Sequence, residues 1–239
     1  MSDSRYDGYQ VWKSWDTQSF GACDAESAAY FASEVAACGL RNLTGARIME
    51  IGFGNAEFAM WATSMGGHYT GFEAIPELVE LGRTRGFDTF HADVAVIDVI
   101  AAESLDLVIA FDVFEHLEIE ALRSLLCDAK LCLRRGGCLM ARMPSGDSPF
   151  SRAVQHGDLT HRTVLGSSAM RQLAIGAGFE VVAIRAPSFP LRGSGWWSLA
   201  RRAAIAVSRA LIYPFISLVL MGGGNPVLSP NMLCVLRKP

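Results

Sequence analysis

Short apolar segments alternate with amphipathic ones along the middle of the chain. Runs such as 46–51 and 105–111 are brief and almost wholly apolar, as expected of strands buried on both faces. Between such runs, apolar residues recur at helical spacing. The expected strands are 46–51, 68–73, 88–93, 105–111 and 138–143, and the expected helices are 56–65, 76–85 and 118–134. This alternation predicts an α/β fold: a doubly wound, mainly parallel sheet with helices on both faces.

The flanking segments complete a single expected domain over 1–239. The N-terminal part, 1–40, holds an aromatic-rich stretch and an amphipathic helix at 26–38; we expect a lid over the core or a segment docked on it. Gly136 and Gly137 are expected to end the helix at 118–134. Beyond Pro144, a polar loop precedes a helix at 167–177. Two further strands, 179–186 and 232–238, bring the sheet to seven strands.

An apolar stretch at 196–221 forms the centre of an expected helical insertion at about 190–225. Its uninterrupted apolar run has twelve positions, fewer than the ~20 needed to cross a bilayer. Two tryptophans and three arginines (Arg201, Arg202 and Arg209) precede the run. This pattern is typical of a helix lying in a membrane interface, with the arginines attracting anionic lipids. The alternative is a helix packed on the protein or on a second copy in a homodimer.

Composition narrows the partner classes. Of 239 residues, 51% are apolar and 19% are charged, which excludes a disordered chain. The 21 basic and 24 acidic residues give a net charge of −3, so no nucleic-acid partner is expected. The six cysteines show no CxxC or CxxH spacing, and the N-terminus has no signal-peptide pattern. Both observations favour a cytoplasmic protein.

The segment 50–56, EIGFGNA, leaves a predicted strand and enters a predicted helix. Gly52 and Gly54 allow a sharp turn and a close approach of a ligand to the main chain. A dinucleotide-binding fingerprint would have Gly or Ala where Glu57 stands, and Glu50 is not part of that fingerprint. An NAD-dependent oxidoreductase is therefore the less favoured alternative.

Three carboxylates follow the next strands. Glu73 ends the second strand, nineteen residues after Gly54, where an acid accepts hydrogen bonds from the hydroxyls of a bound ribose. Asp93 ends the third strand, in position to meet an adenine amine or to cap a helix. Asp112 opens the loop after the fourth strand. These acids predict a nucleoside-containing cofactor.

This ordered set resembles class I S-adenosylmethionine-dependent methyltransferases over about 45–184. The segment 50–56 matches the first motif of that family, Glu73 and Asp93 match its ribose and adenine acids, and 112–116 matches its loop after strand four. The resemblance implies S-adenosylmethionine as the cofactor, bound by Glu50, Gly52, Gly54, Glu73, Asp93 and Asp112. It also implies the strand order 3-2-1-4-5-7-6, with the last strand antiparallel.

The segments WKSW, EIGFGN and GDLTH further resemble methyltransferases that accompany bacterial polysaccharide biosynthesis. That resemblance implies O-methylation of a sugar hydroxyl, on a glycan or a small-molecule precursor. A non-catalytic subunit that binds a ligand or docks on a membrane is the alternative, since binding alone would preserve the same cofactor residues.

A sugar hydroxyl is too weak an acid to ionise at neutral pH, so a catalytic base is expected. His156, Asp158 and His161 share the polar loop after the fifth strand, where ligand crevices form in doubly wound sheets. We expect His161 to be the base, ahead of His156 or Asp158; a hydrogen-bonded loop without a catalytic histidine is the alternative. No HExxH motif or carboxylate triplet is present, so no metal is expected.

Overall fold

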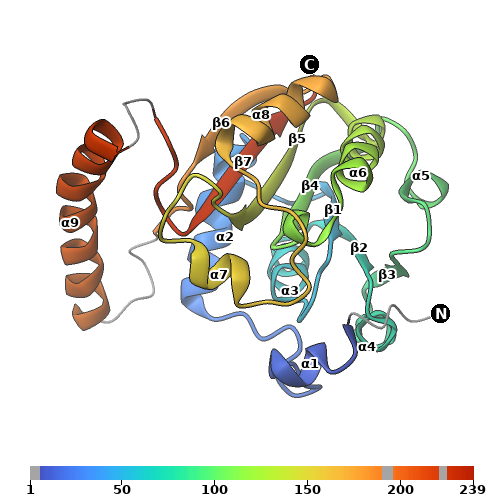
Figure 1. Cartoon of the computed structure of the whole chain (residues 1–239). Helices are drawn as coiled ribbons and strands as arrows, with labels where there is room; N and C mark the ends of the chain where they lie inside the picture. The colour runs from blue at the N-terminus through green and yellow to red at the C-terminus, as the bar shows by residue number, and fades with distance from the viewer. Residues whose placement is uncertain (1–5, 190–195, 221–224) are drawn as a thin grey trace.

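The computed structural model describes residues 6–189, 196–220 and 225–239 (Figure 1). The ends of the expected insertion, and residues 1–5 of the expected lid, lie outside the described residues. The strands are β1 (Arg47–Ile51), β2 (His68–Glu73), β3 (Asp88–His91), β4 (Leu105–Phe111), β5 (Leu133–Pro144), β6 (Glu180–Arg185) and β7 (Asn231–Arg237). They form one sheet in the order β3-β2-β1-β4-β5-β7-β6. All neighbours are parallel except β7, which is antiparallel to β5 and β6. The expected Rossmann-like topology is confirmed.

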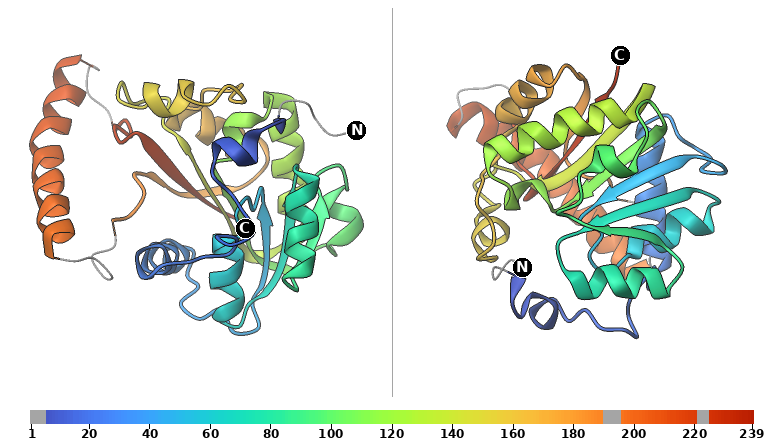
Figure 2. Two further views of the ribbon diagram at one scale, coloured as in Figure 1. Left: turned by 90° about the horizontal axis from the view of Figure 1, so that it is seen from below. Right: turned by 90° about the vertical axis from the view of Figure 1, so that its right-hand side faces the viewer.

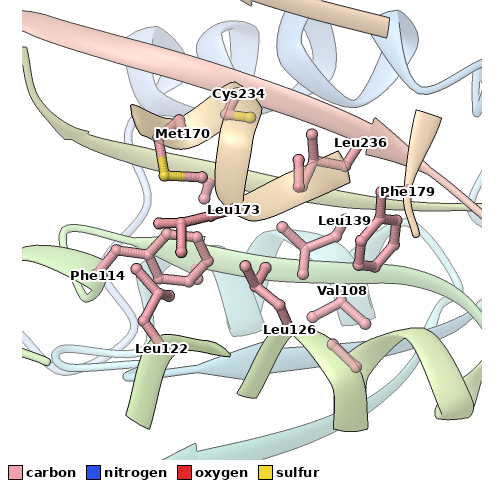
Figure 3. Close-up of a cluster of buried hydrophobic side chains, with 14 of the residues drawn as sticks. Val108, Phe114, Leu122, Leu126, Leu139, Met170, Leu173, Phe179, Cys234 and Leu236 are labelled. Carbon is pink, nitrogen blue, oxygen red and sulfur yellow. The ribbon is translucent and has the colours of Figure 1, made fainter. Parts of the chain in front are cut away.

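Helices cover both faces of the sheet because successive side chains of each strand point to opposite faces. Leu107 and Ile109 of β4 pack toward one helical layer, and Val108 and Ala110 pack toward the other. The first layer contains α2 (Ala25–Ala37), α3 (Glu57–Ser64) and α4 (Pro76–Thr84); the second contains α5 (Val96–Val99), α6 (Ile119–Cys132) and α8 (Ser167–Gly176). Figure 3 shows the second core, where Leu122 and Leu126 of α6 meet Leu173 of α8 against the sheet.

Three short helices interrupt the loops: α1 (Tyr9–Trp12), η2 (Phe114–His116) and α7 (Arg152–His156). The last two follow the carboxyl ends of β4 and β5. Ligands bind at this edge of an open parallel sheet. The chain therefore brings its polar loops to the edge where the sequence places the site.

The expectation that Gly136 and Gly137 end a helix is wrong. Helix α6 ends at Cys132, and β5 begins at once with Leu133, which pairs with Leu105 of β4. The register then jumps, so that Leu107 pairs with Cys138. Gly136, with a φ of +76°, lies in the resulting bulge. Burial of Leu133 in the core holds the chain in the sheet here and overrides the local glycine signal.

Helix α9 (Trp196–Leu220) is inserted between β6 and β7, as expected, and Figures 1 and 2 show it standing beside the domain. Its segment Leu199–Val219 is, by length and hydropathy, the one helix among the described residues that could cross a membrane, and only 11% of that window is buried. The exposed apolar side chains of α9 are Trp196, Trp197, Leu199, Val207, Leu211, Ile212, Phe215, Leu218 and Val219. We call this set the outer face of α9.

The arginines of α9 do not all share this outer face. Arg202 is buried and pairs with Glu26 of α2. Arg209 lies 5.1 Å from the ring centre of Phe189. Only Arg201 of the three is exposed. The expectation that all three arginines face lipid is therefore wrong for Arg202 and Arg209, because their side chains turn back toward the protein.

Candidate active site

A cavity of about 640 Å³ lies at the carboxyl ends of β1, β2 and β4, a volume suited to a small-molecule cofactor and its acceptor. The loop after β1, the end of β2 and the loop after β4 form its base. Tyr9, Lys13 and Trp15 of the N-terminal segment also line it. Two regions far apart in the sequence therefore enclose one site.

The loop after β1 approaches its neighbours so closely that only glycine fits at two positions. Gly52 has a φ of +68°, and a Cβ atom there would lie 2.5 Å from Val113. Gly54 has a φ of +50°, and a Cβ atom there would lie 2.8 Å from the ring of Trp15. Both glycines line the cavity, which leaves their backbone open to a ligand.

Glu73 is buried and fastens this loop to the end of β2. One carboxylate oxygen accepts a hydrogen bond from the backbone N–H of Gly54 at 2.9 Å, and the other accepts from Ala74 at 2.7 Å and Ile75 at 3.1 Å. Burial raises the pKa of Glu73, and the three N–H donors oppose that shift. A carboxylate oxygen has two lone pairs, so the oxygen bonded to Gly54 can also accept from a ribose hydroxyl.

Glu50, on β1, is a second buried carboxyl group in the cavity wall. The hydroxyl of Tyr69 donates to it at 2.7 Å. Burial raises the pKa of Glu50 to about 8, against the opposing effect of this hydrogen bond. A cationic ligand in the cavity would favour the ionised form of Glu50.

Of the two remaining acids, only Asp112 lines the cavity. Asp112 has a φ of +56° and accepts a hydrogen bond from Nε of Arg142 at 3.1 Å. Asp93 is different: its side chain is 81% exposed and lies beside His91, while its neighbours Ala92 and Val94 line the cavity. The structure places Asp93 next to the site, and its role toward adenine stays a prediction.

The N-terminal segment lies over the glycine loop. Trp15 contacts Gly54, and the ring of Tyr9 packs edge-on against Trp15 with centroids 5.8 Å apart. The hydroxyl of Tyr9 donates to Asp158 at 3.0 Å, and the N–H of Gly21 donates to the carbonyl of Asn55 at 2.7 Å. The described part of the expected lid therefore closes one side of the cavity.

None of the three expected base candidates lines the cavity. His161 and Asp158 lie behind His116, which does line it, and the rings of His116 and His161 have centroids 4.7 Å apart. His156 is exposed at the end of α7. The assignment of His161, His156 or Asp158 as the base stays a prediction, but of the three the structure brings only His161 and Asp158 to the rear of the cavity wall.

Two more residues belong to the cluster of polar side chains around His116, Asp158 and His161, and the sequence analysis did not predict them. Thr160 donates to Asp158 at 2.5 Å and contacts Nδ1 of His116 at 2.8 Å. Glu115 is buried beside His161, with its Oε1 atom 3.9 Å from Nε2 of that histidine. Burial and the nearby His161 lower the pKa of His116 to about 4. The available signal was the position of Glu115 and His116, three and four residues after Asp112 in the loop that follows β4.

Comparisons with known proteins define the class. A family model described as "Methyltransferase domain" matches residues 24–184, more than half of the chain. No curated protein matches the chain in sequence. The chain therefore belongs to the methyltransferase domain family.

Solved structures agree on the fold. A SAM-dependent methyltransferase from Archaeoglobus fulgidus superposes with a TM-score of 0.61 at 16% identity, covering 86% of this chain and 94% of that one. The 1,6-didemethyltoxoflavin-N1-methyltransferase of Burkholderia thailandensis, with its substrate and S-adenosylhomocysteine bound, gives 0.55 at 15% identity, covering 98% and 84%. Phosphoethanolamine N-methyltransferase 2 of Haemonchus contortus, in complex with S-adenosyl-L-methionine, gives 0.61 at 16% identity, covering 99% and 60%.

S-adenosylmethionine is the cofactor of this protein. The glycine loop, the clamped carboxylate of Glu73 and the buried acid Glu50 fit a cationic nucleoside-containing group. When bound, the cofactor supplies a methyl group activated by its sulfonium. The NAD-dependent alternative is set aside by the family to which the chain belongs.

Proposed function

We propose that this methyltransferase transfers the methyl group to a sugar hydroxyl of a glycan or a glycan precursor. The observation that carries the proposal is the polar group of Glu115, His116, Asp158 and His161 at the wall of the cofactor cavity. An amine acceptor needs no strong proton acceptor once it is neutral, whereas a hydroxyl does. The resemblance to methyltransferases of bacterial polysaccharide biosynthesis supports a sugar as the acceptor.

The reaction is an in-line displacement. The acceptor oxygen forms a bond to the methyl carbon, the bond from that carbon to sulfur breaks, and its electron pair stays on sulfur. The hydroxyl proton passes to the polar side chains at the cavity wall, among which His116 is the one that lines the cavity. Tyr9 and Trp15 offer apolar rings against which the carbon face of a sugar can rest, which aligns the hydroxyl.

A panel of matched acceptors tests the proposal. Purified protein is incubated with methyl-labelled S-adenosylmethionine and free, nucleotide-linked or polyprenyl-linked sugars, each paired with its 2-amino analogue. Mass spectrometry should locate the label on a hydroxyl oxygen. Transfer to the amino nitrogen alone would overturn the proposal, and cofactor binding without transfer to any acceptor would favour the non-catalytic alternative.

We further propose that the outer face of α9 rests on an anionic bilayer at the cytoplasmic side of the membrane. Nine large apolar side chains are exposed along this one helix, with Arg201 the exposed basic residue among its three arginines. Ser188, Phe189 and Arg202 line the cavity beside α9, so a lipid-linked glycan would reach the site from this direction. The free thiols of all six cysteines suit a reducing compartment.

The connectivity of α9 favours an in-plane helix over a spanning one. Its two ends lead back to β6 and β7, which are paired neighbours in the sheet. If α9 crossed the bilayer once, its two ends would lie on opposite sides of the membrane. One of the segments that join α9 to β6 and β7 would then have to cross the bilayer again. Backbone without internal hydrogen bonds is not tolerated in the hydrocarbon region. The apolar face is therefore expected to lie in the interface.

Co-sedimentation with vesicles of phosphatidylcholine and phosphatidylglycerol tests this attachment. Leu211→Glu and Leu218→Glu on the outer face should abolish binding, because each places a charge in the apolar layer. Arg201→Glu should weaken it only modestly, since one basic residue near the surface contributes ~1 kcal/mol. Absence of wild-type sedimentation, together with a dimer that Leu211→Glu dissociates, would overturn the proposal and identify a subunit interface.

A further inference from the structure

Potential ligand atoms of three side chains converge behind the cavity wall. The side chains of Glu115, His116 and His161 each offer one ligand atom, and these atoms lie within 4.8 Å of one another. Nε2 of His161 is 3.9 Å from Oε1 of Glu115. Oδ2 of Asp158, 3.8 Å from the same nitrogen, already accepts from the Tyr9 hydroxyl and lies 3.8 Å from Nζ of Lys13. Groups that only accept hydrogen bonds repel one another unless a cation lies among them.

The hydrogen bonds of the two histidines direct their outer lone pairs toward this point. Nδ1 of His161 lies 2.8 Å from the carbonyl of Gln155, so Nδ1 carries the proton and Nε2 has a free lone pair. Thr160 donates its hydroxyl proton to Asp158, so Nδ1 of His116 must donate to Thr160. Metal-binding histidines are held in this way, with the ring N–H bonded to a carbonyl, carboxylate or other acceptor.

An unpartnered oxygen of Glu115 independently indicates that a cation binds here. Its residue is 2% exposed, and its Oε2 atom has no hydrogen-bond partner among the described residues. A buried carboxylate oxygen without a partner is costly, because it has lost its water and gained nothing in return. A cation bound at this oxygen would remove that cost.

We propose that Glu115, His116 and His161 bind a divalent metal ion. Two imidazole nitrogens and a carboxylate favour Mn²⁺, Fe²⁺, Co²⁺ or Zn²⁺ over Ca²⁺. Because His116 lines the cavity, an ion bound to it would be accessible to an acceptor in the cavity. The role of the ion rests on the proposed function: a hydroxyl bound to it would lose its proton near neutral pH.

Metal binding is measured without acceptor, so that its outcome is separate from that of the methyl-transfer assay. Chelator-treated protein is titrated with Mn²⁺ by electron paramagnetic resonance and with Zn²⁺ by calorimetry. We expect one site per chain. Glu115→Gln and His161→Ala should each weaken binding at least about tenfold. His156→Ala, in the same loop but exposed, is the matched control and should bind as wild type does.

Retained S-adenosylmethionine binding shows that each variant is folded. Failure of wild-type protein to bind either ion would overturn the proposal. A proton shared among Glu115, His116 and His161 would then explain why their acceptor atoms lie so close together. Wild-type affinity in both Glu115→Gln and His161→Ala would also overturn it. A protein that binds one ion but methylates no hydroxyl would retain the metal site and refute only the proposed function.

Discussion

Glu73 and Glu50 are both buried carboxyl groups in the cavity wall, and they differ in their partners: Glu73 accepts from backbone N–H groups, and Glu50 accepts from a tyrosine hydroxyl. Replacing Glu73 by Ala removes the ribose acceptor and also releases the glycine loop. Charge-assisted hydrogen bonds contribute ~1.5–3 kcal/mol each, so S-adenosylmethionine affinity should fall at least about tenfold. Calorimetry with S-adenosylmethionine, S-adenosylhomocysteine and NAD checks this, with the exposed Glu77→Ala as the control. Unchanged affinity in Glu73→Ala would contradict the assignment.

Glu50 makes the stability of the cofactor-free protein depend on pH. Its pKa is about 8 in the folded protein, above its ordinary value of 4.5. The unfolded chain therefore ionises this group first, and the stability present below pH 4.5 is lost as pH rises toward 8. Glu50→Gln should gain stability relative to wild type over that window, on the order of a few kcal/mol.

Urea unfolding at pH 5 and pH 8.5 measures this difference. The exposed Glu120→Gln is the matched control, because its surface ion pair with Arg123 contributes little. An equal effect of pH on wild type and Glu50→Gln would show that Glu50 ionises normally in the fold.

Replacing His161 tests whether the cluster of polar side chains behind the cavity wall takes part in catalysis. His161→Ala should lower turnover by ~10²–10⁴ while cofactor affinity stays near that of wild type, because His161 lies behind His116 and away from the glycine loop. Steady-state kinetics and calorimetry on the same preparation separate the two quantities. Full activity in His161→Ala would remove this residue from the mechanism, and a matched loss in His68→Ala, at the start of β2, would point to misfolding.

At the scale of elements, the glycine loop and the N-terminal segment act as a pair. Gly54→Ala should reduce both cofactor affinity and stability, because the new methyl group meets Trp15 at 2.8 Å. Gly86→Ala, also at positive φ but with nothing within 4 Å, should show only the backbone cost of about 1 kcal/mol. Thermal unfolding and calorimetry compare the two variants. Equal losses would mean that Trp15 does not rest on the loop in solution.

The elements were predictable where local pattern and burial agree. Strand β4 is apolar along its whole length, and Glu73 ends a strand at the distance from Gly54 that a ribose ligand requires. The strand order came from the family resemblance, because no periodicity in one chain specifies which strands are neighbours. Leu133 was misassigned because its pairing with Leu105 lies far away in sequence.

The same limit applies to the site. His161 and Glu115 are 46 positions apart, and only the fold brings them together. The sequence predicts Arg202 to face lipid because its partner Glu26 is still more remote, 176 positions away. Long-range pairing of polar side chains leaves no mark on the hydrophobic pattern, which is why the cavity wall was predicted less well than the sheet.

For the whole molecule, the domain should be stable without α9. Most of its window is exposed, and β6 and β7 are antiparallel neighbours that a short turn can join. Replacing residues 190–226 with a short Gly/Ser linker should lower the Tm by less than about 5 °C and abolish vesicle binding. Thermal unfolding and calorimetry with S-adenosylmethionine check this. A large loss of stability would mean that α9 is part of the core.

The stacked indoles at the start of α9 also give the protein an optical signal of its own. The rings of Trp196 and Trp197 lie 3.8 Å apart, and both residues are more than two-thirds exposed. Indole emission shifts to shorter wavelength when the ring leaves water, and the near-ultraviolet ellipticity of a stacked pair depends on its geometry. Trp61 is already buried in the core, so its emission should change little. Contact of the start of α9 with vesicles or with a second copy of the chain should therefore shift the tryptophan emission of the purified protein, without a label.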